Sequence, residues 1–256
     1  MSSRMPALFV GHGSPMNAIE ENDFSRGWEH IAREIPRPQA ILSVSAHWYV
    51  PGSRINDSTA PNLIYDMYGF PKALYEVSYP APGAPELAAS VQRLLPGHVA
   101  TDNSWGIDHG TWSVLRRMYP AADIPVTQLS IDRRLSAAEH YRMGRALGGL
   151  RDEGVLILGT GNVVHNLALV NWHMDGGFAW NDEFDGYIRD RIIAGDHESV
   201  INHHGAGASA KMAFTTMEHY YPLLYVLGVS AHEDRVRVFN EAAVLGSISM
   251  TSYVMG

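Results

Sequence analysis

The amino-acid sequence predicts an α/β fold: a single domain with a central mixed β-sheet flanked by helices on both faces. Its 256 residues are 46% hydrophobic and 18% charged, which is enough to build one sizeable core. Short β-type runs alternate with helical patterns, an order typical of helices layered on both faces of a sheet. No low-complexity tract, repeat or long linker divides the chain, so we expect one domain that covers residues 1–256.

Apolar runs along the chain indicate the strands of this sheet. Four near-continuous runs have the length of buried strands: residues 7–10, 40–46, 126–131 and 155–158. Two later runs, residues 235–240 and 247–254, also indicate strands. With these two included, we expect some antiparallel pairing, and therefore a mixed sheet.

Helix-start signals lie between and after these runs. Pro85 opens a helical segment at the position where proline is favoured. Ser136 and Glu139 make a capping box for a helix that we expect to end near Gly154. Residues 180–194 show the periodicity of an amphipathic helix.

Composition excludes several classes of function. The chain contains no cysteine, so disulfides, thiolate metal sites and cysteine nucleophiles are excluded, and any metal must be held by nitrogen and oxygen ligands. A formal charge of −8 without a basic run argues against nucleic acid as a partner. No apolar segment has the length of a membrane span, and the start of the chain lacks a signal-peptide pattern. We therefore expect a cytoplasmic protein; the sequence does not indicate its oligomeric state.

Histidines follow two of the expected strands, at the sheet edge where α/β proteins bind ligands. The first strand leads into His12, which stands between Gly11 and Gly13, and the second leads into His47. The glycines allow a sharp turn that exposes the first imidazole, although an ordinary turn with an incidental histidine explains that segment equally well. Two neighbouring strand ends that both carry histidine favour a metal site, because several neutral imidazoles must converge on one ion.

A third histidine, His165, follows the strand at residues 155–158. The intervening Gly159 and Gly161 suggest a nucleotide-binding G-x-G-x-x-G pattern, but Val164 occupies the place of its third glycine, and the phosphate-binding lysine is absent as well. We therefore interpret these glycines as a tight turn that directs His165 into the same crevice.

Two further histidines are candidates for the site. Pro222 is tolerated only in the first turn of a helix, so Glu218 and His219 lie at or just before a helix start and can point into a site. Asp108 and His109 precede another helical pattern. Because an imidazole titrates near neutrality, His109 is a candidate general acid or base. A helix-capping loop without a catalytic role explains the same segment equally well.

The remaining histidines are not expected to bind a metal. His30 and His140 fall on helical segments at positions expected to be exposed. The others lie in connections or in a segment rich in small residues: His98, His173, His197, His203, His204 and His232.

Five segments together resemble a known family. They are, in order, residues 11–15 (GHGSP), 45–48 (SAHW), 105–110 (WGIDHG), 161–167 (GNVVHNL) and 218–220 (EHY). In these segments the chain is similar to the 4,5-DOPA extradiol dioxygenase family, within the class III ring-cleaving enzymes related to protocatechuate 4,5-dioxygenase. Each segment alone is a weak signal, but five in register over essentially the whole chain are specific.

The resemblance implies roles for the histidines. His12, His47 and His219 correspond to metal ligands, and His165 to a fourth ligand or a catalytic base. His109 corresponds to a second catalytic histidine, which positions substrate or moves protons. More distant members of the class use a glutamate as the third ligand, and here His219 occupies that position with Glu218 beside it.

The resemblance also implies an activity. Fe(II) is expected for a dioxygenase that opens a catechol such as DOPA with O2 and gives a muconate-semialdehyde product, whereas an all-histidine ligand set also suits Zn(II). Because zinc has no redox chemistry, a zinc-dependent hydrolase that uses the same histidines is the alternative. A non-enzymatic metal- or small-molecule-binding module is a third hypothesis, and would require His109 and His165 to be dispensable.

Overall fold

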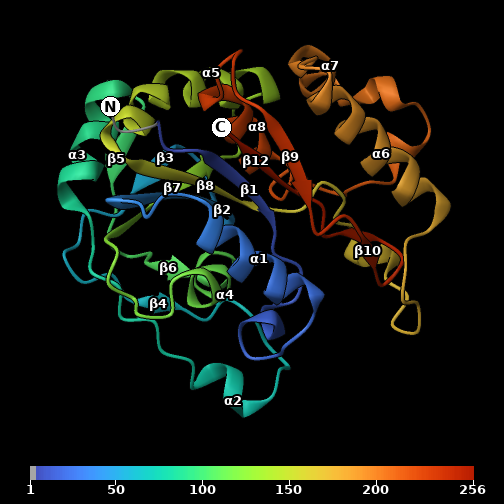
Figure 1. Ribbon diagram of the computed structural model, residues 1–256, viewed down its shortest axis with the longest axis horizontal. Coiled ribbons are helices and arrows are strands. Elements are labelled where there is room, and N and C mark those ends of the chain that lie inside the picture. Colours follow the sequence, from blue (N-terminus) through green and yellow to red (C-terminus); the bar gives the residue numbers. More distant parts are fainter. Residues whose placement is uncertain (1–3) are drawn as a thin grey trace.

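The computed structural model describes residues 4–256 and contains a central eight-stranded sheet (Figure 1). Its strands are β1 (Ala7–Gly11), β2 (Ala40–Val50), β3 (Ser53–Ile55), β5 (Val99–Thr101), β7 (Val126–Asp132), β8 (Val155–Gly161), β9 (Val236–Phe239) and β12 (Ser252–Met255). Their order across the sheet is β5-β3-β7-β2-β8-β1-β12-β9.

The sheet is mixed, as the sequence predicted. Its centre is parallel, with β8 paired to both β1 and β2, and β2 paired to β7. The last strands of the chain add antiparallel pairs at one side, β1 with β12 and β12 with β9. On the other side, β3 pairs antiparallel with β7 and parallel with β5.

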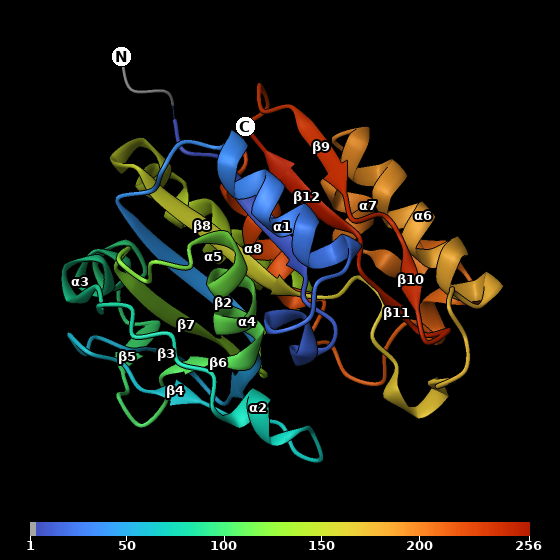
Figure 2. The same cartoon turned by 60° about the horizontal axis from the view of Figure 1, so that its bottom comes forward.

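Helices cover both faces of this sheet (Figures 1 and 2). One face packs against α1 (Asp23–Glu34) and α4 (His109–Met118), and the other against α3 (Pro85–Leu94), α5 (Ala137–Leu147) and α8 (Tyr221–Val229). Strand side chains alternate between the two cores. In β1, for example, Ala7 and Phe9 enter one core and Leu8 and Val10 the other.

Smaller elements surround this framework. Beside β9 and β12 lie α6 (Ala179–Ile193) and α7 (His197–Ile201) (Figures 1 and 2). Two pairs of two-residue strands lie outside the main sheet: β4 (Leu63–Ile64) with β6 (Ile107–Asp108), and β10 (Ala243–Val244) with β11 (Ile248–Ser249). The remaining short helices are α2 (Lys72–Tyr75), η1 (Pro15–Ala18), η2 (Gly148–Glu153), η3 (Leu167–Leu169), η4 (His203–Ala206) and η5 (Ser209–Lys211). Within residues 4–256, no helix combines the length and apolar character needed to cross a bilayer.

Most expected elements are confirmed, with three differences. The predicted capping box at Ser136 begins α5, and Gly154 ends the following 3-10 helix in a left-handed conformation. However, β2 runs four residues past its expected end at residue 46, and a register shift against β7 lies in that extension, so His47 sits within an irregular strand end. The expected strand 247–254 is divided into β11 and β12. The short strands β3 to β6 were not predicted, because such lengths carry no periodicity.

A buried arginine joins both ends of the described chain. Arg151, whose side chain is fully buried, donates to the carbonyl oxygens of Met5 at 2.6 Å, Val229 at 2.9 Å and Met255 at 3.1 Å. Its guanidinium also forms an ion pair with Asp234 at 2.5 Å. Burial raises the pKa of Asp234, but the hydrogen bonds from Arg151 outweigh this effect and the pKa lies below its ordinary value.

Replacing Asp234 by alanine is expected to destabilise the fold by about 3–5 kcal/mol, because it leaves the Arg151 charge buried without its partner. Urea unfolding monitored by circular dichroism would measure the loss. Since the folded pKa of Asp234 is lowered, its contribution is present above the ordinary carboxyl pKa and disappears as the pH falls through the folded value.

The matched control for this substitution is Asp152→Ala. Asp152 pairs with Arg4 and its side chain is 64% exposed, so its loss should change the free energy of unfolding by no more than about 1 kcal/mol. Equal effects of the two substitutions would contradict a structural role for the buried pair.

Candidate metal centre and active site

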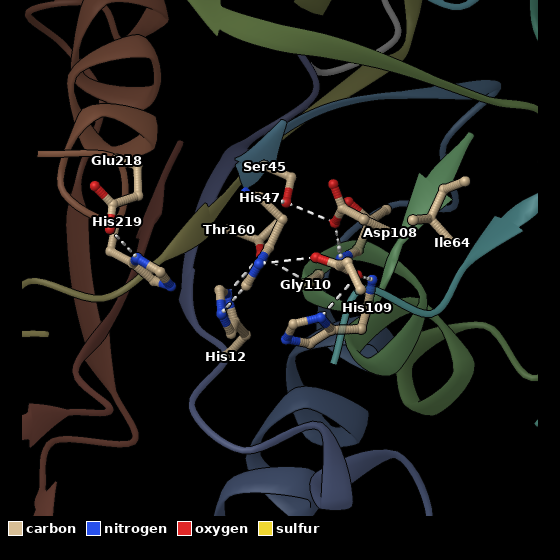
Figure 3. Close-up of polar contacts among 12 residues, drawn as sticks. His12, Ser45, His47, Ile64, Asp108, His109, Gly110, Thr160, Glu218 and His219 are labelled. Atoms are coloured by element: carbon tan, nitrogen blue, oxygen red, sulfur yellow. Dashed lines mark hydrogen bonds and ion pairs between the residues drawn. The ribbon is translucent and has the colours of Figure 1, made fainter. Parts of the chain in front are cut away.

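The histidines singled out in the sequence gather at the carboxyl ends of the central strands. His12 follows β1, His47 lies near the end of β2, and His109 opens α4 (Figure 3). His219, just before α8, points toward them from the other side of the crevice. The ring centres of His12, His47 and His219 lie 5.0, 5.3 and 5.2 Å apart, so three distant chain segments meet in one place.

The tautomer of His12 follows from its hydrogen bonds. Its Nδ1 lies 2.8 Å from the hydroxyl oxygen of Thr160, and that hydroxyl donates its single proton to the carbonyl oxygen of Gly110 at 2.7 Å. The Thr160 oxygen can therefore only accept from His12, whose Nδ1 carries the ring proton. The lone pair of His12 Nε2 is left directed into the crevice.

His47 directs its Nε2 toward the Nε2 of His12. Its Nδ1 lies 2.9 Å from a carboxylate oxygen of Asp66, and its Nε2 lies 3.1 Å from the Nε2 of His12. An ionised carboxylate only accepts, so Nδ1 is the donor and Nε2 again carries a lone pair. With both rings neutral, two lone pairs face each other across 3.1 Å, an arrangement that either a proton on His47 or a metal ion between the two nitrogens relieves.

His109 is fixed by the start of its helix. Asp108 caps α4 by accepting from the backbone N–H of Thr111 at 3.3 Å, and the carboxylate also accepts from Ser45 at 2.6 Å. Burial raises the pKa of Asp108. The Nδ1 and the backbone nitrogen of His109 both donate to Asp66, at 2.9 and 3.2 Å. The helix cap and the two bonds to Asp66 together hold His109 in place. The centre of its ring lies 3.9 Å from the centre of the His47 ring.

His165 and His219 form a stacked pair. Their ring centres are 3.5 Å apart and their planes differ by 9°. In the turn after β8, the backbone nitrogen of His165 donates to the carbonyl oxygen of Ala213. The backbone nitrogen of Asn162, in the same turn, donates to the carbonyl oxygen of His219. These two bonds tie the turn to the segment that precedes α8. Gly161 makes this approach feasible, because a Cβ there would lie 2.1 Å from the carbonyl oxygen of His219.

The Nδ1 of His219 faces a carboxylate, and its Nε2 has no partner. Nδ1 lies 3.3 Å from an oxygen of Glu218. Nε2 is buried and has no hydrogen-bond partner among residues 4–256. An unpartnered buried nitrogen is unfavourable, so this atom needs a partner that the rest of the chain does not supply.

Burial keeps most of these imidazoles neutral at physiological pH. Burial, reinforced by the neighbouring rings, lowers the pKa of His12 and of His219 well below the ordinary value. Burial also lowers the pKa of His109, and it lowers that of His165 to about 4. His47 differs: burial acts to lower its pKa, but the hydrogen bond to Asp66 and the nearby carboxylates outweigh it, so the pKa is raised. Neutral imidazoles are the form that binds metals.

These residues fit a first-row divalent metal. Two nitrogens bonded to one ion at about 2.1 Å lie roughly 3.0–3.4 Å apart for right-angle to tetrahedral geometry, and the His12 and His47 nitrogens are 3.1 Å apart. Two sets of residues each offer ligand atoms within 4.8 Å of one another: His12, His47 and His109; and His165, Glu218 and His219. The donors are nitrogen and oxygen, as the absence of cysteine required.

Asp66 is the residue that the sequence analysis missed. It lies in an irregular segment after β4, where neither periodicity nor a helix cap marks it, yet it contacts both His47 and His109.

The expectation that His140 is exposed was wrong: its side chain is completely buried, and its Nδ1 lies 3.2 Å from the hydroxyl of Tyr225. His203, which lies in the segment rich in small residues, belongs to the short helix η4 and is buried too. The side chain of His30 is 62% exposed, as expected.

Comparison with known proteins identifies the family. Residues 3–256 match the family model described as the catalytic LigB subunit of aromatic ring-opening dioxygenase. The chain belongs to this family of class III extradiol dioxygenases. The dioxygenase is 46% identical to a 4,5-DOPA dioxygenase extradiol of Escherichia coli K12, over all of this chain and 96% of that protein. A protein of the same name from Beta vulgaris is 38% identical over 96% of this chain and 94% of the relative.

A solved structure agrees with this assignment. The crystal structure of an uncharacterized protein from Escherichia coli K12 superposes on the dioxygenase with a TM-score of 0.87 at 41% identity, and covers 99% of this chain and all of that one. The suspected family is thereby confirmed, and the chain is an enzyme of the ring-opening dioxygenase class. Dioxygenases of this family depend on a metal, and the cluster of His12, His47 and His109 offers a site for one. The comparisons do not favour the zinc hydrolase that the sequence left open.

Replacing Gly161 by alanine is expected to destabilise the dioxygenase by about 1–3 kcal/mol. The new Cβ would meet the backbone oxygen of His219, which cannot move by a side-chain rotation. The backbone that carries His219 must shift, so metal affinity should fall as well. Thermal unfolding and metal titration would measure the two effects.

Gly149→Ala is the matched control, because nothing lies within 4 Å of a Cβ at that glycine. We expect it to change the free energy of unfolding by less than about 0.5 kcal/mol. An unchanged melting temperature in Gly161→Ala would rule out the tight packing described above.

Proposed function

We propose that this protein is an extradiol dioxygenase that opens the ring of a catechol with O2 and yields a muconate semialdehyde. The two relatives named above are called 4,5-DOPA dioxygenases, which makes DOPA the first substrate to test. The observation that supports the proposal best is the meeting of three histidine rings, with two Nε2 lone pairs facing each other, in a chain of this family.

We assign the metal to His12, His47 and His219. Imidazoles that share an ion through bonds of about 2.1 Å have ring centres roughly 4.5–5.3 Å apart. The three ring-centre distances in this set are 5.0, 5.3 and 5.2 Å. With His109 in place of His219 the ring-centre distances would be 5.0, 5.8 and 3.9 Å, a less even set, while ligand atoms of His12, His47 and His109 also lie within 4.8 Å of one another. The unpartnered Nε2 of His219 supports the same choice.

We assign proton transfer rather than metal binding to His165. A bound ion lies close to the plane of each imidazole that binds it. The planes of His165 and His219 are nearly parallel and their centres are 3.5 Å apart, so a single ion cannot lie in both planes. His165 is thus proposed as the residue beside the metal ligands that accepts a proton from the substrate, its ring neutral because burial lowers its pKa to about 4.

Fe(II) is the metal that we propose for activity. Held by these residues, Fe(II) would supply the redox chemistry toward O2 that zinc lacks and would bring the catechol and O2 together. Zn(II) suits the same ring nitrogens, so it can compete for the site without supporting oxygenation.

The protein side chains then supply orientation and proton transfer. His109 cannot rotate freely, because both its Nδ1 and its backbone nitrogen donate to Asp66. Its Nε2 is therefore available to take or return a proton on a catechol hydroxyl. His109 and His165 enter the crevice from different elements, α4 and the segment after β8, so the two hydroxyl protons of a catechol can have separate acceptors.

The proposal also includes the domain extent, the partners and the cellular location of the enzyme. One catalytic domain comprises residues 1–256, the partners are a small aromatic substrate and O2, and the location is cytoplasmic. The absence of a basic run argues against nucleic acid as a partner, and the absence of cysteine agrees with a cytoplasmic location.

Protein reconstituted anaerobically with Fe(II) is expected to consume O2 when a catechol is added and to form a yellow ring-opened product. An oxygen electrode and absorbance spectra, with a catechol panel that includes DOPA, would measure both. The Zn(II)-loaded protein should do neither, because zinc has no accessible redox states. Product formation without O2 uptake would point to hydrolysis and defeat the proposal.

His219→Ala and His165→Ala should separate the two stacked rings. Loss of His219 is expected to weaken metal binding by more than the roughly 10–100-fold seen for partners outside the ligand set. Loss of His165 should leave metal affinity within a few-fold and lower kcat by about 10²–10⁴-fold. Chelator competition and steady-state kinetics would measure these effects.

His30→Ala, at an exposed histidine, is the control for both variants and should change neither quantity. Equal loss of metal in His165→Ala and His219→Ala would show that both rings are ligands.

A further inference from the structure

Asp66 is placed between two of the histidines. One oxygen of its carboxylate lies 2.9 Å from the Nδ1 of His47. The other lies 2.9 Å from the Nδ1 of His109 and 3.2 Å from the backbone nitrogen of the same residue. Its side chain is only 15% exposed, so water competes little for these bonds. A single side chain thus accepts three hydrogen bonds from two residues with different proposed roles.

The acceptor character of the carboxylate determines both imidazole tautomers. A neutral imidazole has one N–H, and an ionised carboxylate can only accept. His47 and His109 must therefore both carry the proton on Nδ1, which leaves both Nε2 atoms with lone pairs. A metal ligand and a proton acceptor each need that free Nε2.

The surrounding fold holds Asp66 in this place. The short strands β4 and β6 pair in parallel, with Ile64 opposite Asp108, so the chain just past each strand lies side by side. Trp112, on the same helix as His109, donates its indole N–H to the carbonyl oxygen of Ile64 at 3.0 Å. Tyr65 packs on Trp112 with ring centres 5.7 Å apart. The segment that carries Asp66 is therefore tied to the helix that carries His109.

We propose that Asp66 is a positioning residue that holds His47 and His109 in the Nδ1–H tautomer, and so couples metal binding to proton transfer. The proposal rests on the roles of His47 and His109 in the proposed function. It assigns no contact between Asp66 and substrate or metal.

Asparagine at position 66 is the decisive substitution, because an amide has one accepting oxygen and one donating nitrogen. The position beside His109 faces two donors, and the position beside His47 faces one. The amide oxygen should therefore turn toward His109 and the amide nitrogen toward His47. His47 must then accept at Nδ1, its proton moves to Nε2, and that nitrogen is no longer available to a metal.

Asp66→Asn is thus expected to weaken Fe(II) and Zn(II) binding by about 10–100-fold, as measured by chelator competition. Histidine ¹⁵N NMR of the metal-free protein, in alkaline buffer where imidazoles are neutral, should show His47 as the Nε2–H tautomer in the variant and Nδ1–H in the parent. Asp66→Glu keeps two acceptor oxygens and should recover part of the affinity.

Asp57→Asn is the matched control. Asp57 also accepts from two side chains, Thr101 at 3.1 Å and Asn103 at 2.7 Å, neither of which is a histidine. This variant should keep the metal affinity and the histidine spectrum of the parent protein.

The NMR measurement on the unsubstituted protein keeps the proposal testable even if Asp66→Asn fails to fold. An Nε2–H proton on His47 or His109 in that spectrum would overturn the proposal, and so would undiminished metal affinity in folded Asp66→Asn. Neither readout depends on catechol cleavage. A protein that binds metal with the expected tautomers but opens no ring would refute the proposed function and leave the assignment of Asp66 intact.

Discussion

The site depends on one electrostatic constraint: imidazole lone pairs face one another in a buried crevice. His12 and His47 direct their Nε2 atoms at each other across 3.1 Å, and in the neutral form of each ring the single proton is on Nδ1, which already donates. Lone pairs at this distance repel each other, and burial removes the water that would screen them. A metal ion between the two nitrogens relieves the repulsion, and so does a proton on His47, whose pKa is raised; the site therefore favours a positive charge at its centre.

The fold keeps this arrangement from relaxing. His12 is held through Thr160 to the carbonyl of Gly110, a residue of α4, and so joins strands β1 and β8 to that helix. On the opposite side, the backbone carbonyl of His219 accepts from Asn162, which ties the start of α8 to the end of β8. Rotating the ring of His12 or His47 away from the centre would break its hydrogen bond to Thr160 or Asp66, and the backbone bond of His219 fixes where its ring begins.

Sequence patterns could locate the histidines because these follow elements that patterns reveal. His12, His47 and His165 come after apolar runs, and His219 is placed by Pro222. Asp66 could not be found this way: it follows a two-residue strand, and only the three-dimensional pairing of β4 with β6 brings it to His109. His140 was misplaced for a related reason. Its helix α5 packs on α8 closely enough that a Cβ at Gly144 would lie 2.5 Å from the backbone of Tyr225, and this contact between distant segments buries the imidazole.

In the ligand set proposed above, the placement of carboxylates would balance the charge of a divalent metal. Asp66 and Glu218 each lie behind a histidine, one on Nδ1 of His47 and the other on Nδ1 of His219. Together they carry two negative charges, which balance the charge of a divalent cation, while the atoms directed at the centre remain neutral nitrogens. A neutral ligand leaves more of the metal charge available to a bound catechol than a carboxylate ligand would. In the proposed site, the negative charge therefore lies one hydrogen bond behind the ligand atoms, and the atoms that face the proposed catechol position stay neutral.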